Sequence, residues 1–404
     1  MKCLNKLIPL LFSSLILLKP ILSEEVWVYF DAHRSRHKSS ALAIERGFLT
    51  ALSEIDSRIG DRVIKLKKLD HRGNSVRSRN HMERFLEDEK ALFILGGLHS
   101  PPLIKYRSWI NDNKIPILVP WAAGGPITRH PSSDNWIFRC SVDDSKAGKV
   151  MANYALSKGM KKPALVMEDT PWGKGNQKNV SKALKEVLGS IPTTVWFNWN
   201  TKEEGARIKL RDLLRKGHDG IILVGNAGES LAFCKAMASL ENRIPIVSHW
   251  GITGGNFEEK LGTELLEKID LSFIQTRFSF ISSKGHDLSR SVWDQAKNLF
   301  PEELKVHRDL KSPTGFIHAY DLAKLAISAM KKMEWSETPK MSRDGLRKSL
   351  ESLSEPVTGL IKVYEKPFGP WSKDNIDAHE ALGEKDLAFG RFRLDGAIEL
   401  VKAN

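Results

Sequence analysis

Cysteine is scarce in this chain, with three residues among 404. Cys3 precedes an N-terminal apolar run, so the mature protein would keep only Cys140 and Cys234. Two distant cysteines cannot form a disulfide framework, and neither has a second Cys or a His at the spacing of a zinc site. They could pair with each other, but a chain of this length has a large core, and we expect two buried, unpaired thiols.

Long apolar runs are also missing, except at the N-terminus. There, Lys2 and Lys6 precede the short run "LIPLLFSSLILL", and an acidic pair begins at Glu24. This order is typical of a secretory signal peptide, which we place at residues 1–23 with cleavage near Ser23. A membrane anchor is the alternative, but the run is too short to span a bilayer comfortably. We therefore expect a periplasmic mature protein.

Catalytic motifs are absent from the sequence. It has no nucleophile elbow, no phosphate-binding or dinucleotide glycine loop and no zinc-type His/Glu helix; "HEALG" at His379 lacks the second histidine. The net charge of +13 is spread along the chain and not gathered into a stripe, which argues against a nucleic-acid partner. We expect no catalytic residue, cofactor or metal, although an enzyme with a dispersed site stays a third alternative.

Apolar strand patterns and amphipathic helix patterns alternate along the chain. Examples are the strands "VWVYF", "ALFILGG", "PALVME" and "GIILVG", each followed by a helical pattern. Such repeated units predict parallel sheets with helices on both faces. Because 404 residues exceed one compact core, the α/β chain should form two lobes, with a break near residues 135–148.

Small and polar residues follow two of the predicted strands. The turn "VPWAAGGPIT" (119–128) comes directly after "IPILV", and "GGLHSPP" places Ser100 before Pro101. Ligands of open parallel sheets bind outside the carboxyl ends of the strands. Ser100 is therefore both a predicted helix N-cap and a candidate for holding a ligand carboxylate.

At this point the chain resembles the type 1 periplasmic solute-binding proteins, the leucine/isoleucine/valine-binding branch that serves ABC transporters. The resemblance covers nearly the whole mature chain. It depends on the order of several segments: "ALAIERGFLTALSEID", "ILGGLHS", "IPILVPWAAGGPIT", "NWIFRCSVDD", "PALVMEDTPWGKG", "FIHAYDLAKLAISAM" and "FGRFRLDG".

The resemblance implies two Rossmann-like lobes with parallel sheets, joined by a hinge of three crossovers near residues 140, 275 and 356. Lobe 1 would take residues 24–140 and 275–355. Lobe 2 would take residues 141–274 and 356–404.

The resemblance also implies a ligand site. Ala122, Ala123 and Gly124 match the segment that offers backbone groups to a bound amino acid, and Trp172, placed in a turn by its neighbours, matches an aromatic cover. Asn226 falls near another wall position. From the basic loop "HRSRHKSS", we expect Ser40 and its neighbour Ser39 to contact the ligand. The charges of this loop either are solvated or steer an anion.

Two departures bear on the ligand. Gly124 stands where amino-acid binders carry a hydroxyl, and Trp250 stands where they carry the acidic partner of the ammonium. Glu229 is a neighbouring carboxylate that could substitute. These departures predict a carboxylate or other polar-headed compound, aromatic compounds included, in preference to leucine, isoleucine or valine.

We expect a monomer that captures a small organic solute and delivers it to the membrane permease of an ABC transporter. The solute would be amino-acid-like, or a carboxylate or aromatic compound. A periplasmic sensor that reports to a membrane receptor is the alternative. The transport and sensor functions differ in the membrane partner, and the sequence does not show which partner the protein has.

Overall fold

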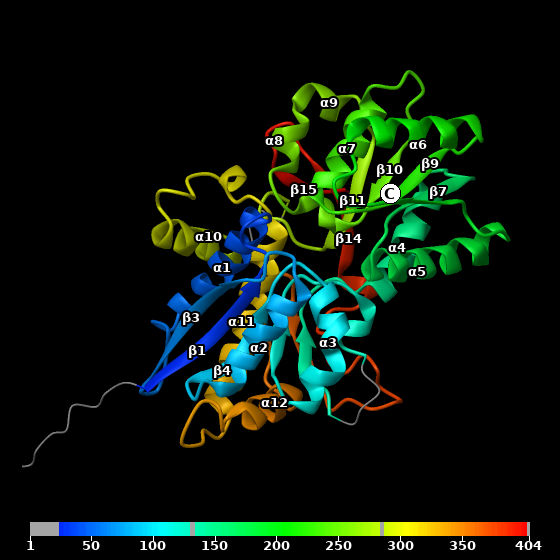
Figure 1. The fold of residues 1–404 in the computed structure, drawn as a ribbon. Helices are drawn as coiled ribbons and strands as arrows, with labels where there is room; N and C mark the ends of the chain where they lie inside the picture. The colour runs from blue at the N-terminus through cyan, green and yellow to red at the C-terminus, as the bar shows by residue number, and fades with distance from the viewer. Residues whose placement is uncertain (1–23, 130–133, 283–286, 402–404) are drawn as a thin grey trace, which may run out of the picture.

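A computed structural model describes residues 24–129, 134–282 and 287–401. The predicted signal peptide, residues 1–23, lies outside the described residues. Figure 1 shows two lobes, each built around one large sheet. Both sheets are mostly parallel and covered by helices, as the alternating pattern predicts.

The first large sheet has six strands and uses the N-terminal part of the chain. β1 lies in its middle and pairs in parallel with β3 and β4. In spatial order the strands are β2 (Arg58–Ile59), β3 (Arg62–Asp70), β1 (Glu24–Ala32), β4 (Ala91–Gly96), β5 (Ile117–Val119) and β6 (Ile137–Arg139).

The second large sheet has seven strands, and its last two come from the C-terminus. β14 pairs antiparallel with β11, while β9, β10 and β11 are parallel. In spatial order the strands are β15 (Ile398–Leu400), β14 (Leu387–Phe392), β11 (Leu271–Thr276), β10 (Ile246–Ser248), β9 (Gly220–Val224), β7 (Pro163–Glu168) and β8 (Thr194–Phe197).

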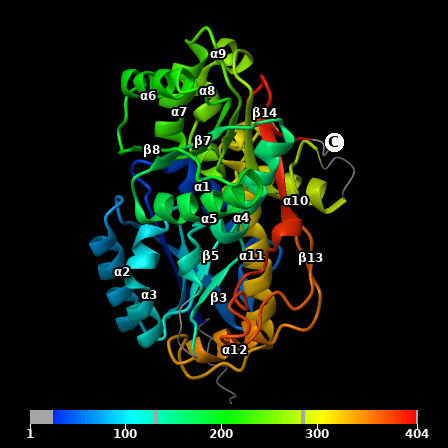
Figure 2. The same ribbon diagram turned by 90° about the vertical axis from the view of Figure 1, so that its right-hand side faces the viewer.

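Helices fill both faces of each sheet. Figure 2 shows α2 and α3 on one side of the first lobe, and α6 and α7 at the outer side of the second. The helices are α1 (Lys38–Ser53), α2 (Ser75–Glu87), α3 (Pro101–Asp112), α4 (Asp144–Ser157), α5 (Pro171–Leu188), α6 (Glu203–Arg215), α7 (Ala227–Ala238), α8 (Phe257–Leu261), α9 (Thr263–Glu267), α10 (Asp287–Leu299), α11 (Pro313–Lys332) and α12 (Arg343–Glu351). A short hairpin, β12 (Val357–Thr358) and β13 (Val363–Tyr364), follows α12.

The central strand β1 shows how the sequence pattern builds these layers. Val26, Val28 and Phe30 belong to the core that contains α1 and α11. Tyr29 points to the opposite face and joins the core of α2 and α3. A strand with apolar side chains on both faces is stable only when helices cover both, because successive side chains alternate.

The predicted strands and helices agree closely with the structure, with one informative difference. Trp172 was expected in a turn, but it lies in the first turn of α5, which begins at Pro171. Thr170 caps this helix by accepting a hydrogen bond from the Gly173 amide at 3.2 Å. Proline fits the first helical position because its missing N–H would have no partner there, so the Pro-Trp-Gly sequence starts a helix.

The chain passes between the two sheets more than once. β6 belongs to the first sheet and β7 to the second, and β14 returns to the second sheet after α10–α12. Before that return, Glu380 forms an isolated bridge with Arg139 of β6. The lobe boundaries stay a proposal, in which we place the third crossing between Glu380 and β14, later than residue 356.

Two further sequence expectations concern cysteines and membranes. Cys140 and Cys234 are both buried and unpaired, which confirms that interpretation. Within the described residues, no helix combines the length and apolar character that crossing a membrane requires.

Candidate functional site

A cavity with about 370 Å³ of empty space lies where the carboxyl ends of strands from both sheets meet. We call it the Trp cavity. It is lined by Leu98, His99, Ser100, Pro101, Trp121, Ala123, Glu168, Trp172, Trp199, Asn226, Trp250 and Gly251.

Four tryptophans give this cavity its apolar walls. Trp121 and Trp250 lie with ring centroids 6.1 Å apart, although they come from different sheets. Trp172 meets the ring of His249 edge-on at 5.0 Å, and His249 in turn contacts Asp144 through Nε2 at 2.8 Å. Trp121, Trp172 and Trp250 are all buried, so this part of the lining is aromatic and nearly sealed from solvent.

Ser100 and the small-residue turn meet at one end of the Trp cavity. Ser100 precedes α3, but its side chain does not cap that helix. The first two helical residues are prolines, which have no N–H to donate to a capping side chain. Ser100 Oγ instead accepts a hydrogen bond from the Gly124 amide at 3.0 Å. Ser100 therefore occupies the predicted N-cap position, but the predicted side-chain capping bond is not formed. The Ser100 O–H proton can still be donated to a ligand.

A buried arginine holds the same turn from behind. Arg139 has a fully buried side chain, and its Nη1 donates to the carbonyl oxygens of Gly124 at 2.9 Å and Ala122 at 3.3 Å. Its charge faces Glu380 and Asp143. The turn is thus fixed by a charged group that sequence reasoning missed, because its partner Glu380 lies 241 residues away.

A carboxylate of the Trp cavity was also missed. Glu168 is 2 % exposed, and its oxygens accept from Trp199 Nε1 at 2.7 Å and from Asn226 Nδ2 at 3.3 Å. Burial raises the pKa of Glu168, and the nearby charge of Glu229 adds to this. Among the described residues, no Lys, Arg or His forms an ion pair with it. It is the last residue of the buried strand "PALVME", so the carboxyl-end argument used for Ser100 would have found it.

The structure brings five of the eight predicted site residues to the Trp cavity: Ser100, Ala123, Trp172, Asn226 and Trp250. Ala122 and Gly124 are buried behind the cavity wall. A Cβ added to Gly124 would lie 2.8 Å from Ile104 Cδ1, so this glycine is packed against α3. Ser40 is buried outside the cavity, near Gly254.

Hydrogen bonds also join the start of α1 to loops that follow strands of the seven-stranded sheet. Arg36 Nη2 donates to Asn200 Oδ1 at 2.5 Å, and Ser39 Oγ donates to Asn256 Oδ1 at 2.9 Å. Glu229, the proposed substitute for the ammonium partner, lines a neighbouring cavity and accepts from the Asn200 amide at 3.0 Å. These contacts lie at the cavity that adjoins the Trp cavity and shares His99, Trp199 and Asn226 with it.

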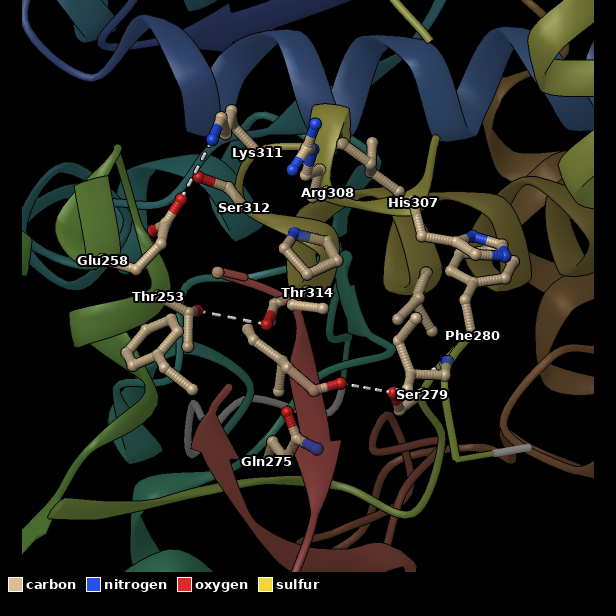
Figure 3. Close-up of a pocket in the computed structure, with 18 of the residues that line it drawn as sticks. Thr253, Glu258, Gln275, Ser279, Phe280, His307, Arg308, Lys311, Ser312 and Thr314 are labelled. Atoms are coloured by element: carbon tan, nitrogen blue, oxygen red, sulfur yellow. Dashed lines mark hydrogen bonds and ion pairs between the residues drawn. The ribbon is translucent and has the colours of Figure 1, made fainter. Parts of the chain in front are cut away.

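A second cavity, with about 670 Å³ of empty space, lies beside the passage from β11 to α11 (Figure 3). No predicted site residue lines it. Its polar groups are largely paired with one another: Thr253 with Thr314 at 3.1 Å, and Lys311 with Glu258 at 3.1 Å. The Trp cavity is the stronger candidate because five of the eight predicted site residues line it.

Two α/β lobes with a polar and aromatic cavity between strand ends define a cleft-type ligand-binding protein. The family model for "Periplasmic binding protein" matches residues 35–259, more than half of the chain. The chain belongs to the periplasmic binding protein family, which confirms the resemblance to the type 1 proteins. The family consists of substrate-binding proteins. No curated protein matches the chain significantly.

Solved structures show the same fold at low sequence identity. A possible leucine/isoleucine/valine-binding protein from Rhodopirellula baltica SH 1 has a TM-score of 0.77 and 16% identity, covering 95% of this chain and 98% of its own. A leucine-binding protein from Thermotoga maritima MSB8 has a TM-score of 0.75 and 15% identity, covering 93% and 98%. An ABC transporter solute-binding protein from R. palustris in complex with benzoate has a TM-score of 0.75 and 15% identity, covering 93% and 95%.

Proposed function

We propose that this protein is an exported substrate-binding protein, not an enzyme, that encloses one small organic solute in the Trp cavity. As a monomer it would then present the closed, liganded form to the membrane permease of an ABC transporter. Membership of the periplasmic binding protein family supports this role. So does the position of the Trp cavity at strand ends of both sheets.

The observation that carries the proposal is a buried carboxylate without a cation. Glu168 lines the Trp cavity, is almost fully buried and has no ion-pair partner in the described part of the chain. Burying a carboxylate is costly, and the hydrogen bonds that Glu168 accepts from Trp199 and Asn226 compensate this cost only in part, because both donors are uncharged. A ligand ammonium would supply the missing charge.

Donors for the other end of the solute lie in the same cavity. The Trp121 indole is fully buried, and its Nε1 has no hydrogen-bond partner among the described residues. The Ser100 hydroxyl lies on the same lining. A carboxylate or hydroxyl oxygen of the solute would satisfy these donors.

These groups together favour a flat or aromatic solute that carries both an amine and an acidic group. The expectation that the site has lost its ammonium acceptor considered Gly124, Trp250 and the substitute Glu229, but not Glu168, which places a carboxylate in the cavity lining. We therefore propose an aromatic amino-acid-like ligand. Among the structural relatives, one is named for leucine and another binds benzoate.

A matched set of three compounds tests this proposal: phenylalanine, 3-phenylpropionate and phenethylamine. We expect phenylalanine to raise the melting temperature most, because only it meets both Glu168 and the donors. Glu168→Gln should weaken phenylalanine binding by about 10–100-fold in calorimetry, the loss of one hydrogen bond to a charged group. 3-Phenylpropionate should bind both proteins equally.

The variant Glu229→Gln tests whether Glu229, and not Glu168, is the acceptor of the ligand ammonium. It lies outside the Trp cavity, so the preference for phenylalanine over 3-phenylpropionate should persist in this variant. Equal binding of the amino acid and its deaminated acid by the unaltered protein, with no change in Glu168→Gln, would show that Glu168 is not an ammonium acceptor.

A further inference from the structure

Four histidines gather at the carboxyl ends of three neighbouring strands of the six-stranded sheet. His33 follows β1, His71 follows β3, and His99 follows β4. His37 lies one turn after His33, and its amide donates to the His33 carbonyl at 3.2 Å before α1 begins. Their ring centroids are separated by 4.8–5.8 Å where the rings meet.

Three of these rings present ligand atoms toward one another. One ring nitrogen each of His33, His37 and His99 lies within 4.8 Å of the other two. A zinc ion about 2.1 Å from each nitrogen in a tetrahedral site would place the nitrogens about 3.4 Å apart. Small side-chain rotations would close the difference without moving the backbone.

The same rings have unsatisfied polar atoms and are held neutral. Nδ1 of His33 and Nδ1 of His99 are buried and have no hydrogen-bond partner among the described residues. Burial lowers the pKa of His37 to about 3, with help from the neighbouring His33 and Arg36. Burial likewise lowers the pKa of His33 and, more strongly, that of His99. Neutral imidazoles keep the lone pairs that metal ions bind.

His71 is a neighbour of the three and not a fourth ligand. Its Nδ1 accepts a hydrogen bond from the Gly73 amide at 3.0 Å, which places its proton on Nε2. Gly73 has φ +71°, and a Cβ there would lie 3.0 Å from Cε1 of His33. This glycine therefore leaves room for the His33 ring to stand where it does.

We propose that His33, His37 and His99 bind one divalent transition-metal ion of the zinc class at the mouth of the cleft. Three imidazoles without thiolate or carboxylate suit Zn²⁺, Co²⁺, Ni²⁺ or Cu²⁺ and not Mg²⁺ or Ca²⁺. Three protein ligands leave one tetrahedral position open, as in zinc sites that bind a further molecule. No metal was expected from the sequence, in which His99 lies far along the chain from His33 and His37.

The open position faces a cavity shared by both sides of the cleft. His33, His37 and His99 line it together with Glu229 and Lys260, and His99 also lines the Trp cavity beside Ser100. Arg36 and Lys260 add positive charge close to the rings. An anion, either hydroxide or a carboxylate, is therefore the expected fourth ligand.

Metal titration of the untagged mature protein tests the proposal without any organic solute, so its outcome does not depend on the proposed function. After chelator treatment, we expect calorimetry with ZnCl₂ to give one equivalent bound. Co²⁺ should give the intense visible bands of a four-coordinate site. His33→Ala, His37→Ala and His99→Ala should each weaken binding by about 100-fold or more, beyond the 10–100-fold typical of outer-shell changes.

Two histidine variants serve as controls. His218→Gln removes a buried histidine bonded to the Lys162 carbonyl, far from the cluster in the other sheet's lobe. His71→Gln removes the neighbour that is not a ligand. Both should keep one equivalent of zinc, and the melting temperature of each metal-free variant checks its folding. Absence of zinc binding by the unaltered protein, or equal binding by all five variants, would overturn the proposal.

Discussion

The Arg139–Glu380 ion pair makes a quantitative prediction about how the small-residue turn is held. Arg139 is fully buried, and its Nε contacts the two carboxylate oxygens of Glu380 at 3.0 and 2.9 Å. Glu380→Ala would remove this partner and leave Asp143, whose oxygen lies 3.1 Å from Arg139 Nη2. The buried charge would then be only partly compensated.

The magnitude follows from that partial compensation. Removing one partner of a buried pair costs about 3–5 kcal/mol, and because Asp143 remains, we expect a loss of about 3 kcal/mol for Glu380→Ala. Glu380→Gln keeps one acceptor oxygen, so its loss should be about 2 kcal/mol, within the range for a hydrogen bond to a charged group. Arg139 also anchors the carbonyls of Ala122 and Gly124, so solute binding in the Trp cavity should weaken as well.

Urea unfolding followed by tryptophan fluorescence and circular dichroism measures these losses. Glu83→Gln is a matched control, because Glu83 pairs with Arg79 at 3.1 Å while 49% exposed; it should lose no more than about 0.5 kcal/mol. If Glu380→Ala loses no more than this control, the buried pair does not stabilise the turn, and the reasoning is refuted.

Two further predictions concern a buried histidine and a close helix contact. Burial lowers the pKa of His318 to about 3. Below about pH 6.5, the pKa of histidine in the unfolded chain, the unfolded chain binds a proton that the folded chain does not bind. The unfolding free energy therefore falls as the pH drops. The unfolding free energy of the protein relative to His318→Gln should therefore fall by about 2–3 kcal/mol between pH 6.5 and 4.5, and a pH-independent difference would contradict this assignment. A Cβ on Gly47 of α1 would lie 2.1 Å from the Phe316 carbonyl oxygen of α11, so Gly47→Ala should lower the unfolding free energy by about 1–3 kcal/mol. Gly205→Ala, a helical site with nothing within 4 Å, should raise it by about 0.4–1 kcal/mol, and similar urea midpoints for both variants would disprove the close packing.

The sequence was sufficient to predict those features of the fold that short-range interactions determine. The apolar strands, the amphipathic helices and the break before α4 were all readable, because the period of the apolar residues reflects which faces are buried. Ser100 and the turn at 119–128 were predicted to share one site for a similar reason: parallel strands end at the same edge of the sheet. The contact between Ser100 Oγ and the Gly124 amide agrees with that expectation.

Local reasoning failed where a residue's partner is distant in the chain. One error was local instead: the sequence "TPWGK" contains both turn and helix signals, and the cap that Thr170 provides to the Gly173 amide, three residues on, determines which of them applies. Glu168 could have been found from its place at the end of β7, but its lack of a cationic partner could not, because that depends on every element around it.

By itself, the sequence determined the two-lobed α/β architecture and the edge of the sheets where the candidate site lies. Periodicity and strand order fix these, since each segment carries its own pattern of burial. Only the tertiary structure decided that Glu380 compensates Arg139 across 241 residues. It also decided that Trp121 meets Trp250, and that His33, His37 and His99 converge. Such contacts form between side chains that only the packing of sheets and helices brings together. The spacing of these residues along the chain therefore does not predict them.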